Sequence, residues 1–252
     1  MIHIKTPQEI EGIRKSCKLL AELFKKIEEE ELVSEGVTTK DIDKFVESFI
    51  REHGARPAFL GYRGYPASAC VSLNDEVVHG IPSQKRKLKK GDLVKIDTGI
   101  NLEGFISDAA RTYYVGDVVP ETVRKLMDSV KDAFYSGVEK ALPGRHLSDI
   151  SHAIQEIARK YGVSVIKELG GHGVGLRLHE DPFVPNYGPP GRGPLLRAGM
   201  VLAIEPMFAL GDGRVYTAKD GWTIATRDGS LTAHYENTIL ITEKGFEILT
   251  EI

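Results

Sequence analysis

The chain has 252 residues, of which 41% are hydrophobic and 27% charged, values typical of a soluble globular protein. Its formal net charge of −3 lacks the basic excess of most nucleic-acid-binding domains, so no DNA partner is expected. The apolar runs are too short for a transmembrane helix or a secretory signal, and two cysteines are too few for a disulfide framework. These features predict a cytoplasmic protein with no membrane partner.

Helical periodicity predicts two helices in the first half of the chain. Residues 6–9 (TPQE) form a capping box with a proline in the first turn, and apolar residues recur at helical spacing up to Ile27. A second helix begins at Thr38 or Thr39 and ends before Gly54. Strand-like segments follow at 67–73, 93–100 and 105–115.

The second half restarts the same order. Helices are predicted at 120–142 and 147–161, strands at 163–168, 200–208, 222–225 and 234–242, and a loop rich in Gly and Pro at 186–194. The basic run KRKLKK at 85–90 is interpreted as a solvated surface loop. Because strands follow helices in both halves, we expect an α+β fold with helices covering one face of a curved, mostly antiparallel sheet.

The two halves also share sequence at an offset of 108 residues. GDLVKID in the first half matches GMVLAIE in the second, and both copies end on an acid, Asp97 and Glu205. We therefore expect a single domain, 1–252, built from related halves of about 1–116 and 117–252. In such a duplication the two acids face each other across a pseudo-twofold axis, an arrangement that suits oxygen-liganded divalent cations.

Three more potential ligands lie in strand-like or glycine-rich segments. Asp108 is in GFISDAART, Glu236 is in HYENTI, and His172 is in GGHGVG, where four glycines allow close approach of other backbone. Alone, such an acid is more often a turn or salt-bridge residue, and a histidine in a Gly-rich turn, as we expect for His172, is usually no ligand. Asp97 and Glu205 occupy matched positions of the repeat, however, so the presence of an acid at both is not two independent coincidences. Two divalent cations balance the four carboxylates, and this donor set favours Mn, Fe, Co or Zn.

At these residues the sequence resembles the type I methionine aminopeptidases, the short bacterial form with the pita-bread fold. The resemblance covers nearly the whole chain and rests on the strings KIDTG, SDAART, GGHGVG, IEPM and HYENTI, in that order. It implies a dinuclear site in which Asp108 and Glu236 bridge two ions, Asp97 binds one ion, and His172 and Glu205 bind the other.

The resemblance also implies catalytic roles for two histidines that alone would be interpreted as surface or turn residues. His79, in VVHGIP, contacts the substrate amine and the scissile amide and aids proton transfer; His179, in LHEDP, donates to the substrate carbonyl. Glu205 is expected to take a proton from the attacking water. His234 lies two residues before Glu236, on the same face of a strand, and is expected to support the site.

The family's methionine pocket is matched in part. Its tyrosines, cysteine and tryptophan correspond to Tyr62, Tyr65, Cys70 and Trp222. Leu178 stands where the family usually has an aromatic residue, and Phe59 where a small residue or a cysteine is common. The pocket stays apolar, so an unbranched thioether side chain remains the expected occupant.

The function expected from this resemblance is removal of the N-terminal methionine from peptides and nascent proteins, with a small second residue favoured. It also implies transient association with the ribosome, and a monomer is expected. An X-Pro dipeptidase or aminopeptidase P of the same fold remains open, although such enzymes normally carry a large extra N-terminal domain and only about ninety residues precede Asp97 here. A non-catalytic pita-bread binding module also remains open, although such modules show broken ligand sets.

Overall fold

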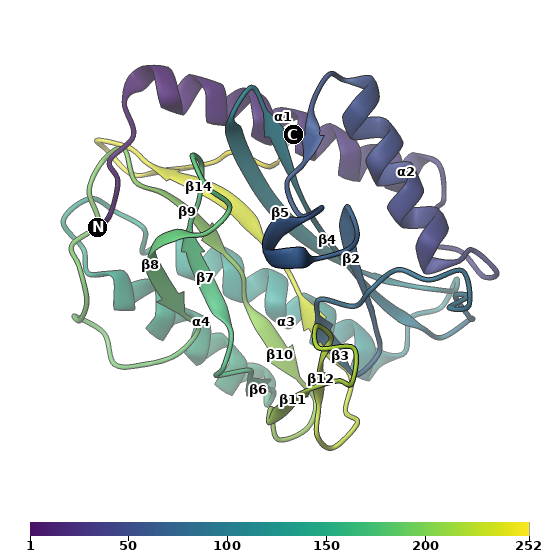
Figure 1. Ribbon diagram of the computed structural model, residues 1–252. Helices are drawn as coiled ribbons and strands as arrows, with labels where there is room; N and C mark the ends of the chain where they lie inside the picture. Colours follow the sequence, from purple (N-terminus) through teal and green to yellow (C-terminus); the bar gives the residue numbers. More distant parts are fainter. Residues whose placement is uncertain (252) are drawn as a thin grey trace.

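The computed structural model describes residues 1–251 and arranges them as helices followed by strands, twice over (Figure 1). The helices are α1 (Pro7–Glu29), α2 (Thr39–Glu52), α3 (Glu121–Val138) and α4 (Leu147–Tyr161), with a short 3₁₀ turn, η1 (Tyr62–Gly64). The strands are β1 (Arg56–Pro57), β2 (Ala69–Leu73), β3 (Glu76–Val78), β4 (Leu93–Leu102), β5 (Phe105–Tyr114), β6 (Ser164–Val165), β7 (Gly170–Gly173), β8 (Glu180–Pro185), β9 (Val201–Ile204), β10 (Met207–Ala209), β11 (Val215–Thr217), β12 (Ile224–Thr226), β13 (Thr232–His234), β14 (Asn237–Ile241) and β15 (Phe246–Ile248).

Local sequence determines where the first two helices begin. The Thr6 hydroxyl accepts a hydrogen bond from the backbone N–H of Glu9, and the Glu9 carboxylate accepts one from the backbone N–H of Thr6. Thr38 and Asp41 form the same reciprocal pair at the start of α2. Each capping box satisfies backbone donors that the first turn of a helix leaves free.

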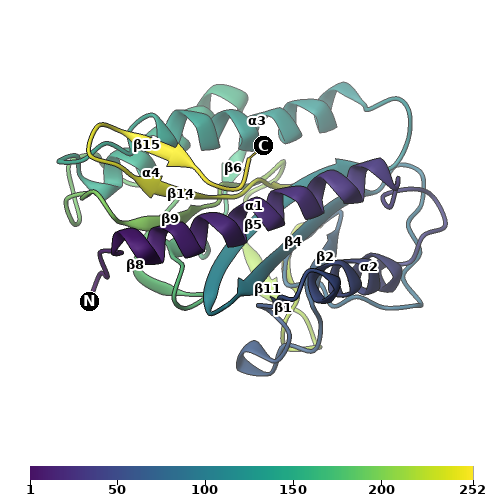
Figure 2. The ribbon, with the colours of Figure 1, turned by 90° about the horizontal axis from the view of Figure 1, so that it is seen from above.

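The strands pair antiparallel throughout the ladders of the described chain. In the first half, β1, β4 and β2 are neighbours and β5 pairs with β4; in the second, the order is β15-β14-β9-β7-β8. A bridge between Ala110 on β5 and Glu236, just before β14, joins the two groups. Seen from above in Figure 2, β9 and β14 lie between α1 on one side and the α3–α4 pair on the other.

Three apolar clusters correspond to this layering. One forms where α1 and α2 pack on β2, β4 and β5, and a second where α3 and α4 pack on β9, β10, β13 and β14. A third lies between them and includes Cys17, Phe59, Tyr65, Leu178 and Val201. The helices α2 and α4 begin 108 residues apart, as the sequence repeat requires. The division into halves near residue 116 stays a prediction, which the first two clusters support.

Two expected strands are interrupted, each at a candidate ligand. The segment 200–208 forms β9 and β10 on either side of Glu205. The segment 234–242 forms the end of β13 and all of β14, with Glu236 between them. The glycine-rich segment around His172, expected as a turn, is instead the strand β7. These breaks leave the two carboxylates outside regular ladders, where their side chains reach the centre between the sheets.

Other differences concern short elements. The helix expected to reach residue 142 ends at Val138. Strand β6 is shorter than the expected strand at 163–168, and β12 begins later than the expected strand at 222–225. Strands β3, β8, β11 and β15 were not expected; most are three residues long, which is too short to show periodicity. No helix within residues 1–251 combines the length and apolar character needed to cross a lipid bilayer.

Candidate metal centre and substrate pocket

Carboxylates and imidazoles from both groups of strands converge on one cavity. The five residues predicted as ligands all line this cavity. They are Asp97 on β4, Asp108 on β5, His172 on β7, Glu205 after β9 and Glu236 before β14. His172 Nε2 lies 3.4 Å from Glu205 Oε1 and 3.6 Å from Asp108 Oδ2. The structure therefore brings all five residues to a common centre, although they span 140 positions of sequence.

The potential ligand atoms form two overlapping groups. One atom each of Asp108, His172 and Glu236 lie within 4.8 Å of one another, and one atom each of Glu205, His234 and Glu236 do the same. His234 Nε2 is 3.7 Å from a carboxylate oxygen of both Glu205 and Glu236. His234 is thus buried beside the acids, as the strand alternation predicts, and its geometry also suits a direct ligand.

Burial dominates the electrostatics of these groups. It raises the pKa of Asp97 to about 7. Burial, reinforced by neighbouring carboxylates, raises the pKa of Asp108, Glu205 and Glu236 well above the usual range. Burial lowers the pKa of His172 to about 4. Acids that resist ionisation beside imidazoles that resist protonation are the expected consequence of crowding metal ligands in an apolar interior.

Several buried polar atoms of this cluster have no hydrogen-bond partner among the described residues. They are Asp97 Oδ1, Asp108 Oδ1, Glu236 Oε1 and both ring nitrogens of His234. Unpartnered buried donors and acceptors are rare in proteins, and each calls for an explanation. Carboxylate oxygens and imidazole nitrogens are ligand atoms that bind Mn, Fe, Co and Zn. The residues present therefore fit divalent cations.

Glycines allow β7 to carry His172 between two other strands. A side chain at Gly171 would collide with the backbone oxygen of Ala203 on β9, and one at Gly170 would meet the Val184 oxygen of β8 at 2.6 Å. Only glycine permits backbone approach this close. The expectation that these glycines leave room for neighbouring backbone is confirmed, while their assignment to a turn is wrong.

Two further side chains form hydrogen bonds with the backbone of the segments that carry the ligands, and sequence reasoning missed both. Arg111 donates to the backbone oxygens of Glu236 at 2.6 Å and of Ala110 at 2.9 Å. Asn186 Nδ2 donates to the backbone oxygen of Glu205 at 2.9 Å. Arg111 lies within the string SDAART, so its position beside Asp108 was a usable signal; Asn186 lies in a loop and offered none.

The acid cluster opens into a cavity of about 220 Å³. Its apolar wall contains every residue predicted for the substrate pocket, namely Phe59, Tyr62, Tyr65, Cys70, Leu178 and Trp222. The rings of Tyr65 and Trp222 meet edge to face with centroids 5.1 Å apart. Pockets for drug-sized ligands usually exceed about 300 Å³, so this one suits a single side chain with its reacting bond.

The two predicted catalytic histidines lie at the same cavity. His79 is half-buried, burial lowers its pKa, and its ring is 6.4 Å from that of Trp222. The ring of His179 is 4.1 Å from that of His172, and its Nδ1 lies 2.9 Å from the Tyr62 hydroxyl. Both histidines therefore flank the acid cluster from loops rather than from strands.

Other residues of the cavity were not predicted. They are Arg63, Val78, Leu169, Gly170 and Met207. Met207 follows Glu205 by two residues in IEPM, and Gly170 precedes His172 by two, so both have the spacing that places alternate strand residues on one side. Arg63, Val78 and Leu169 carry no comparable pattern.

Comparison with known proteins agrees with this geometry. The model of metallopeptidase family M24 matches residues 11–243. Methionine aminopeptidase of Clostridium acetobutylicum is 50% identical over 250 residues, covering 99% of each chain. Methionine aminopeptidase 1 of Bacillus subtilis is 46% identical over the full length of both chains.

Solved structures give the same result. The crystal structure of methionine aminopeptidase from Thermotoga maritima superposes with a TM-score of 0.96 at 45% identity, covering 100% of both chains. Prolidase from Pyrococcus furiosus has a TM-score of 0.78 at 29% identity, and the match covers 99% of this chain but 65% of that one. This chain therefore has the pita-bread fold and belongs to metallopeptidase family M24, among its methionine aminopeptidases.

Proposed function

We propose that this chain removes the N-terminal methionine from peptides and nascent proteins by hydrolysing the first peptide bond, with a small second residue favoured. One observation carries the proposal. A cavity of about 220 Å³ joins a wall of apolar and aromatic side chains to a buried cluster of carboxylates and imidazoles. Such a cavity accommodates one apolar side chain and holds its amide next to hydrolytic groups. Full-length similarity to methionine aminopeptidases supports the same reaction.

We infer that two divalent cations, of Co, Mn, Fe or Zn, would be held by the predicted ligands. Asp108 and Glu236 would be shared between them, Asp97 would hold one, and His172 with Glu205 the other. The unpartnered buried oxygens of the three acids Asp97, Asp108 and Glu236 support this assignment. When bound, the cations lower the pKa of a water molecule and polarise the scissile carbonyl.

Glu205 is proposed to move the proton. Burial, with the negative charge of Glu236 nearby, raises the pKa of its carboxyl group well above the ordinary range, which makes its carboxylate a stronger base. The ionised carboxylate can accept a proton from the attacking water and, once protonated, return it to the leaving nitrogen. Its backbone oxygen accepts a hydrogen bond from Asn186, which holds the backbone that carries this side chain.

The two loop histidines are proposed to contact the substrate. His179 Nδ1 lies 2.9 Å from the Tyr62 hydroxyl, which orients the ring and leaves Nε2 to donate to the scissile carbonyl. One such donor is typically worth about 3 kcal/mol in a transition state. Burial lowers the pKa of His79, so its ring is neutral at pH 7 and can exchange a proton with the substrate amine or scissile amide.

The apolar wall is proposed to select methionine. Phe59, Tyr65, Cys70 and Leu178 are buried, while Tyr62 and Trp222 are half-buried. Aromatic edges and a thiol give soft contacts to a thioether, and none of these six residues carries a charged side chain. Leu178 and Phe59 determine the width of this pocket.

X-Pro dipeptidase activity is the second candidate, because prolidases share the fold. Their matched structures are longer, and this chain covers 65% of the Pyrococcus furiosus chain. The non-catalytic binding module is disfavoured because all five ligand residues line one cavity.

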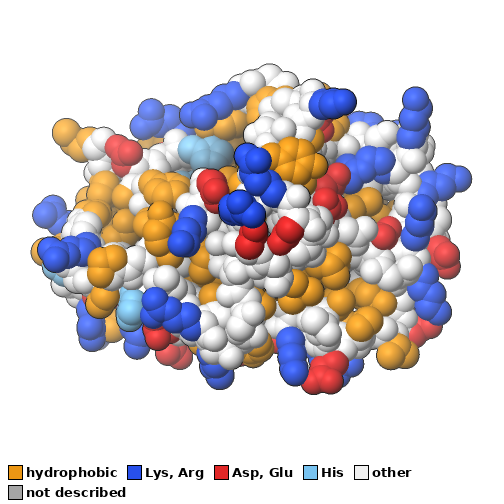
Figure 3. Space-filling view, turned by 90° about the horizontal axis from the view of Figure 1, so that it is seen from below, with side chains coloured by type: hydrophobic (Ala, Val, Ile, Leu, Met, Phe, Trp, Pro, Cys, Tyr) orange, Lys and Arg blue, Asp and Glu red, His pale blue; other side chains and the backbone are white. Residues whose placement is uncertain are grey.

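We also propose that the protein is a cytoplasmic monomer that meets its substrates at the ribosome. The face seen in Figure 3 carries Lys and Arg side chains interspersed with acidic and apolar ones, and no single basic field is visible on it. A transient encounter with a nascent chain is therefore proposed in place of stable nucleic-acid binding.

The test uses metal-stripped protein re-supplied with Co, Mn, Fe or Zn. Release of methionine from Met-Gly-Met-Met and Met-Ala-Ser is compared with cleavage of Ala-Pro. Activity on the methionyl peptides with Ala-Pro left intact is expected. Preferential cleavage of Ala-Pro would establish the dipeptidase instead, and failure to bind any of the cations would favour the binding module.

A further inference from the structure

The backbone of His79 adopts an unusual conformation. Its φ is +61°, in the left-handed region that only a few per cent of residues other than glycine occupy, although Asn, Asp and His do so more often than the rest. Four other non-glycine residues of the described chain share a positive φ, and they are Glu31, Arg63, Asn74 and Glu103. Strained backbone persists only where surrounding contacts hold it, and it concentrates at functional sites. The contacts around His79 therefore show what keeps its ring at the cavity.

Hydrogen bonds grip the residue that follows His79. The backbone N–H of Gly80 donates to Ser72 Oγ at 3.0 Å, and the backbone oxygen of Gly80 accepts from Val71 N at 2.9 Å. Thr223 Oγ1 lies 3.4 Å from the backbone oxygen of His79 itself. The two bonds of Gly80 attach the segment to β2, and Thr223 lies just before β12.

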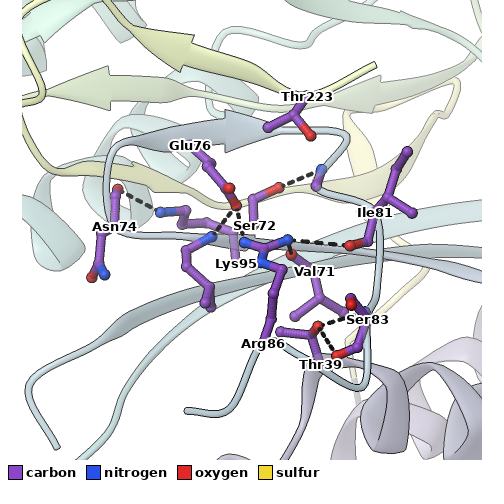
Figure 4. Close-up of polar contacts among 12 residues, drawn as sticks. Thr39, Val71, Ser72, Asn74, Glu76, Ile81, Ser83, Arg86, Lys95 and Thr223 are labelled. Carbon is purple, nitrogen blue, oxygen red and sulfur yellow. Dashed lines mark hydrogen bonds and ion pairs between the residues drawn. The ribbon is translucent and has the colours of Figure 1, made fainter. Parts of the chain in front are cut away.

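Arg86 holds the next residue along. Its Nη1 donates to the backbone oxygen of Ile81 at 3.2 Å and, at 3.4 Å, to that of Val71. Its Nη2 forms an ion pair with Glu76, whose carboxylate also accepts from the backbone N–H of Leu73 at 2.7 Å. Figure 4 shows the guanidinium between Glu76 and Ile81. One side chain thus connects the β2–β3 hairpin to the segment after His79.

This position departs from the interpretation of residues 85–90 as a solvated loop. The side chains of Arg86 and Glu76 are 26% and 22% exposed. The neighbours Lys85 and Lys87 are exposed, as expected for a surface loop. A planar guanidinium can contact two carbonyl oxygens and a carboxylate at once, which a lysine ammonium cannot match in geometry. This position therefore requires the guanidinium group of an arginine, and a positive charge alone is not sufficient.

We propose that Arg86 is a positioning residue for His79: it clamps the carbonyl of Ile81 and so holds the left-handed backbone that presents the His79 imidazole to the cavity. The inference rests on the proposed role of His79 in the reaction. No predicted cation ligand contacts the Arg86 side chain. Loss of Arg86 therefore impairs turnover through His79 and leaves cation binding intact.

The test is a double-mutant cycle with Arg86→Gln and His79→Ala, assayed with Met-Gly-Met-Met on manganese-loaded protein. Arg86→Gln is expected to lower kcat by about tenfold, because displacements near 1 Å at a reacting group cost up to a hundredfold. In the His79→Ala background the same change is expected to cost less than about twofold. Manganese affinity, measured by calorimetry, stays unchanged in both. Lys85→Gln is the matched control and keeps the wild-type kcat.

Each outcome separates the inference from the proposed function. A wild-type kcat in His79→Ala refutes the role of His79, and the inference is lost with it. A damaged His79→Ala in which Arg86→Gln removes a further tenfold leaves that role standing and refutes the positioning by Arg86. Arg86→Lys keeps the charge opposite Glu76 and is expected to recover part of the loss; if Arg86→Gln does not fold, the cycle is run with Arg86→Lys.

Discussion

Replacing Gly171 by alanine tests how tightly the centre depends on strand β7. The added Cβ would approach the backbone oxygen of Ala203 far more closely than 3.0 Å, a separation that real Cβ atoms essentially never breach. Ordinary contact begins at 3.4 Å, so β7 must move by about 1 Å away from β9. The partner is backbone inside a sheet and cannot rotate aside. The strain must therefore distort the hydrogen-bonded pairing of β7 with β9.

His172 is the next residue and pairs with Ala203 across the same ladder. Its Nε2 lies 3.4 Å from Glu205 and 3.6 Å from Asp108, so a 1 Å shift removes it from its position between these carboxylates. We expect Gly171→Ala to cost about 3 kcal/mol of unfolding free energy. We also expect kcat/KM to fall by about a hundredfold and cation affinity to fall with it.

The assays are urea denaturation, calorimetric titration with manganese and hydrolysis of a methionyl peptide. Gly54→Ala is the control, because Gly54 has φ of +72° and no atom within 4 Å of an added Cβ. It should cost about 1 kcal/mol from backbone strain alone and leave activity unchanged. A Gly171→Ala protein as stable as the control, with wild-type manganese affinity, would refute the argument that β7 is held rigidly between its neighbours.

Three further predictions follow from burial and backbone geometry. Burial raises the pKa of Asp97 to about 7 and the pKa of Asp108 and of Glu236 well above the usual range, so cation binding to metal-free protein should release protons and tighten as pH rises; calorimetry in buffers of different ionisation enthalpy measures this, and buffer-independent heats would contradict it. Lys5→Met should cost about 3 kcal/mol in urea denaturation, because the ion pair of Lys5 with Glu180 is only 1% and 4% exposed and the carboxylate is left without its cation; a loss below about 1 kcal/mol, as for a surface pair, would show that it contributes little. His79→Gly should be more stable than His79→Ala by about 1 kcal/mol, because glycine accepts φ of +61° without strain; equal stabilities would mean that this backbone is not strained.

Much of the centre could be predicted because two of its ligands end apolar runs that match at a fixed offset. Asp97 and Glu205 end the matching runs GDLVKID and GMVLAIE, and an acid that ends a buried apolar run requires a partner. All five predicted ligands and all six predicted apolar pocket residues line the cavity. Their individual roles stay predictions, since bringing side chains together does not establish which atom moves a proton.

The strand boundaries at the ligands could not be predicted from periodicity. Apolar character continues through Pro206 and Tyr235, so the segments look like single strands, while the chain must bend there to bring Glu205 and Glu236 to the centre. The opposite error occurred at His172, where the surrounding glycines indicated a turn although the segment is a strand. Glycine is rare in strands unless neighbouring backbone comes very close, and for Gly171 that neighbour, Ala203, lies 32 residues away in sequence.

The residues that hold the ligand segments were missed because their partners are backbone atoms. Arg111 bonds to carbonyls of Glu236 and Thr250, and Arg86 bonds to those of Ile81 and Val71. Backbone acceptors occur at every position, so no sequence pattern marks which one an arginine will reach. Such contacts appear only once the topology has placed the segments together.

The order in which the ligands occur along the chain has a consequence for synthesis of the protein. Asp97 and Asp108 leave the ribosome early, whereas Glu236 belongs to the last sixth of the chain and reaches Ala110 through the bridge that joins β5 to the start of β14. Contacts between residues this distant in sequence form late in folding. An unfinished copy thus lacks Glu236 at the cavity, and the cluster of carboxylates is completed only when the final strands dock.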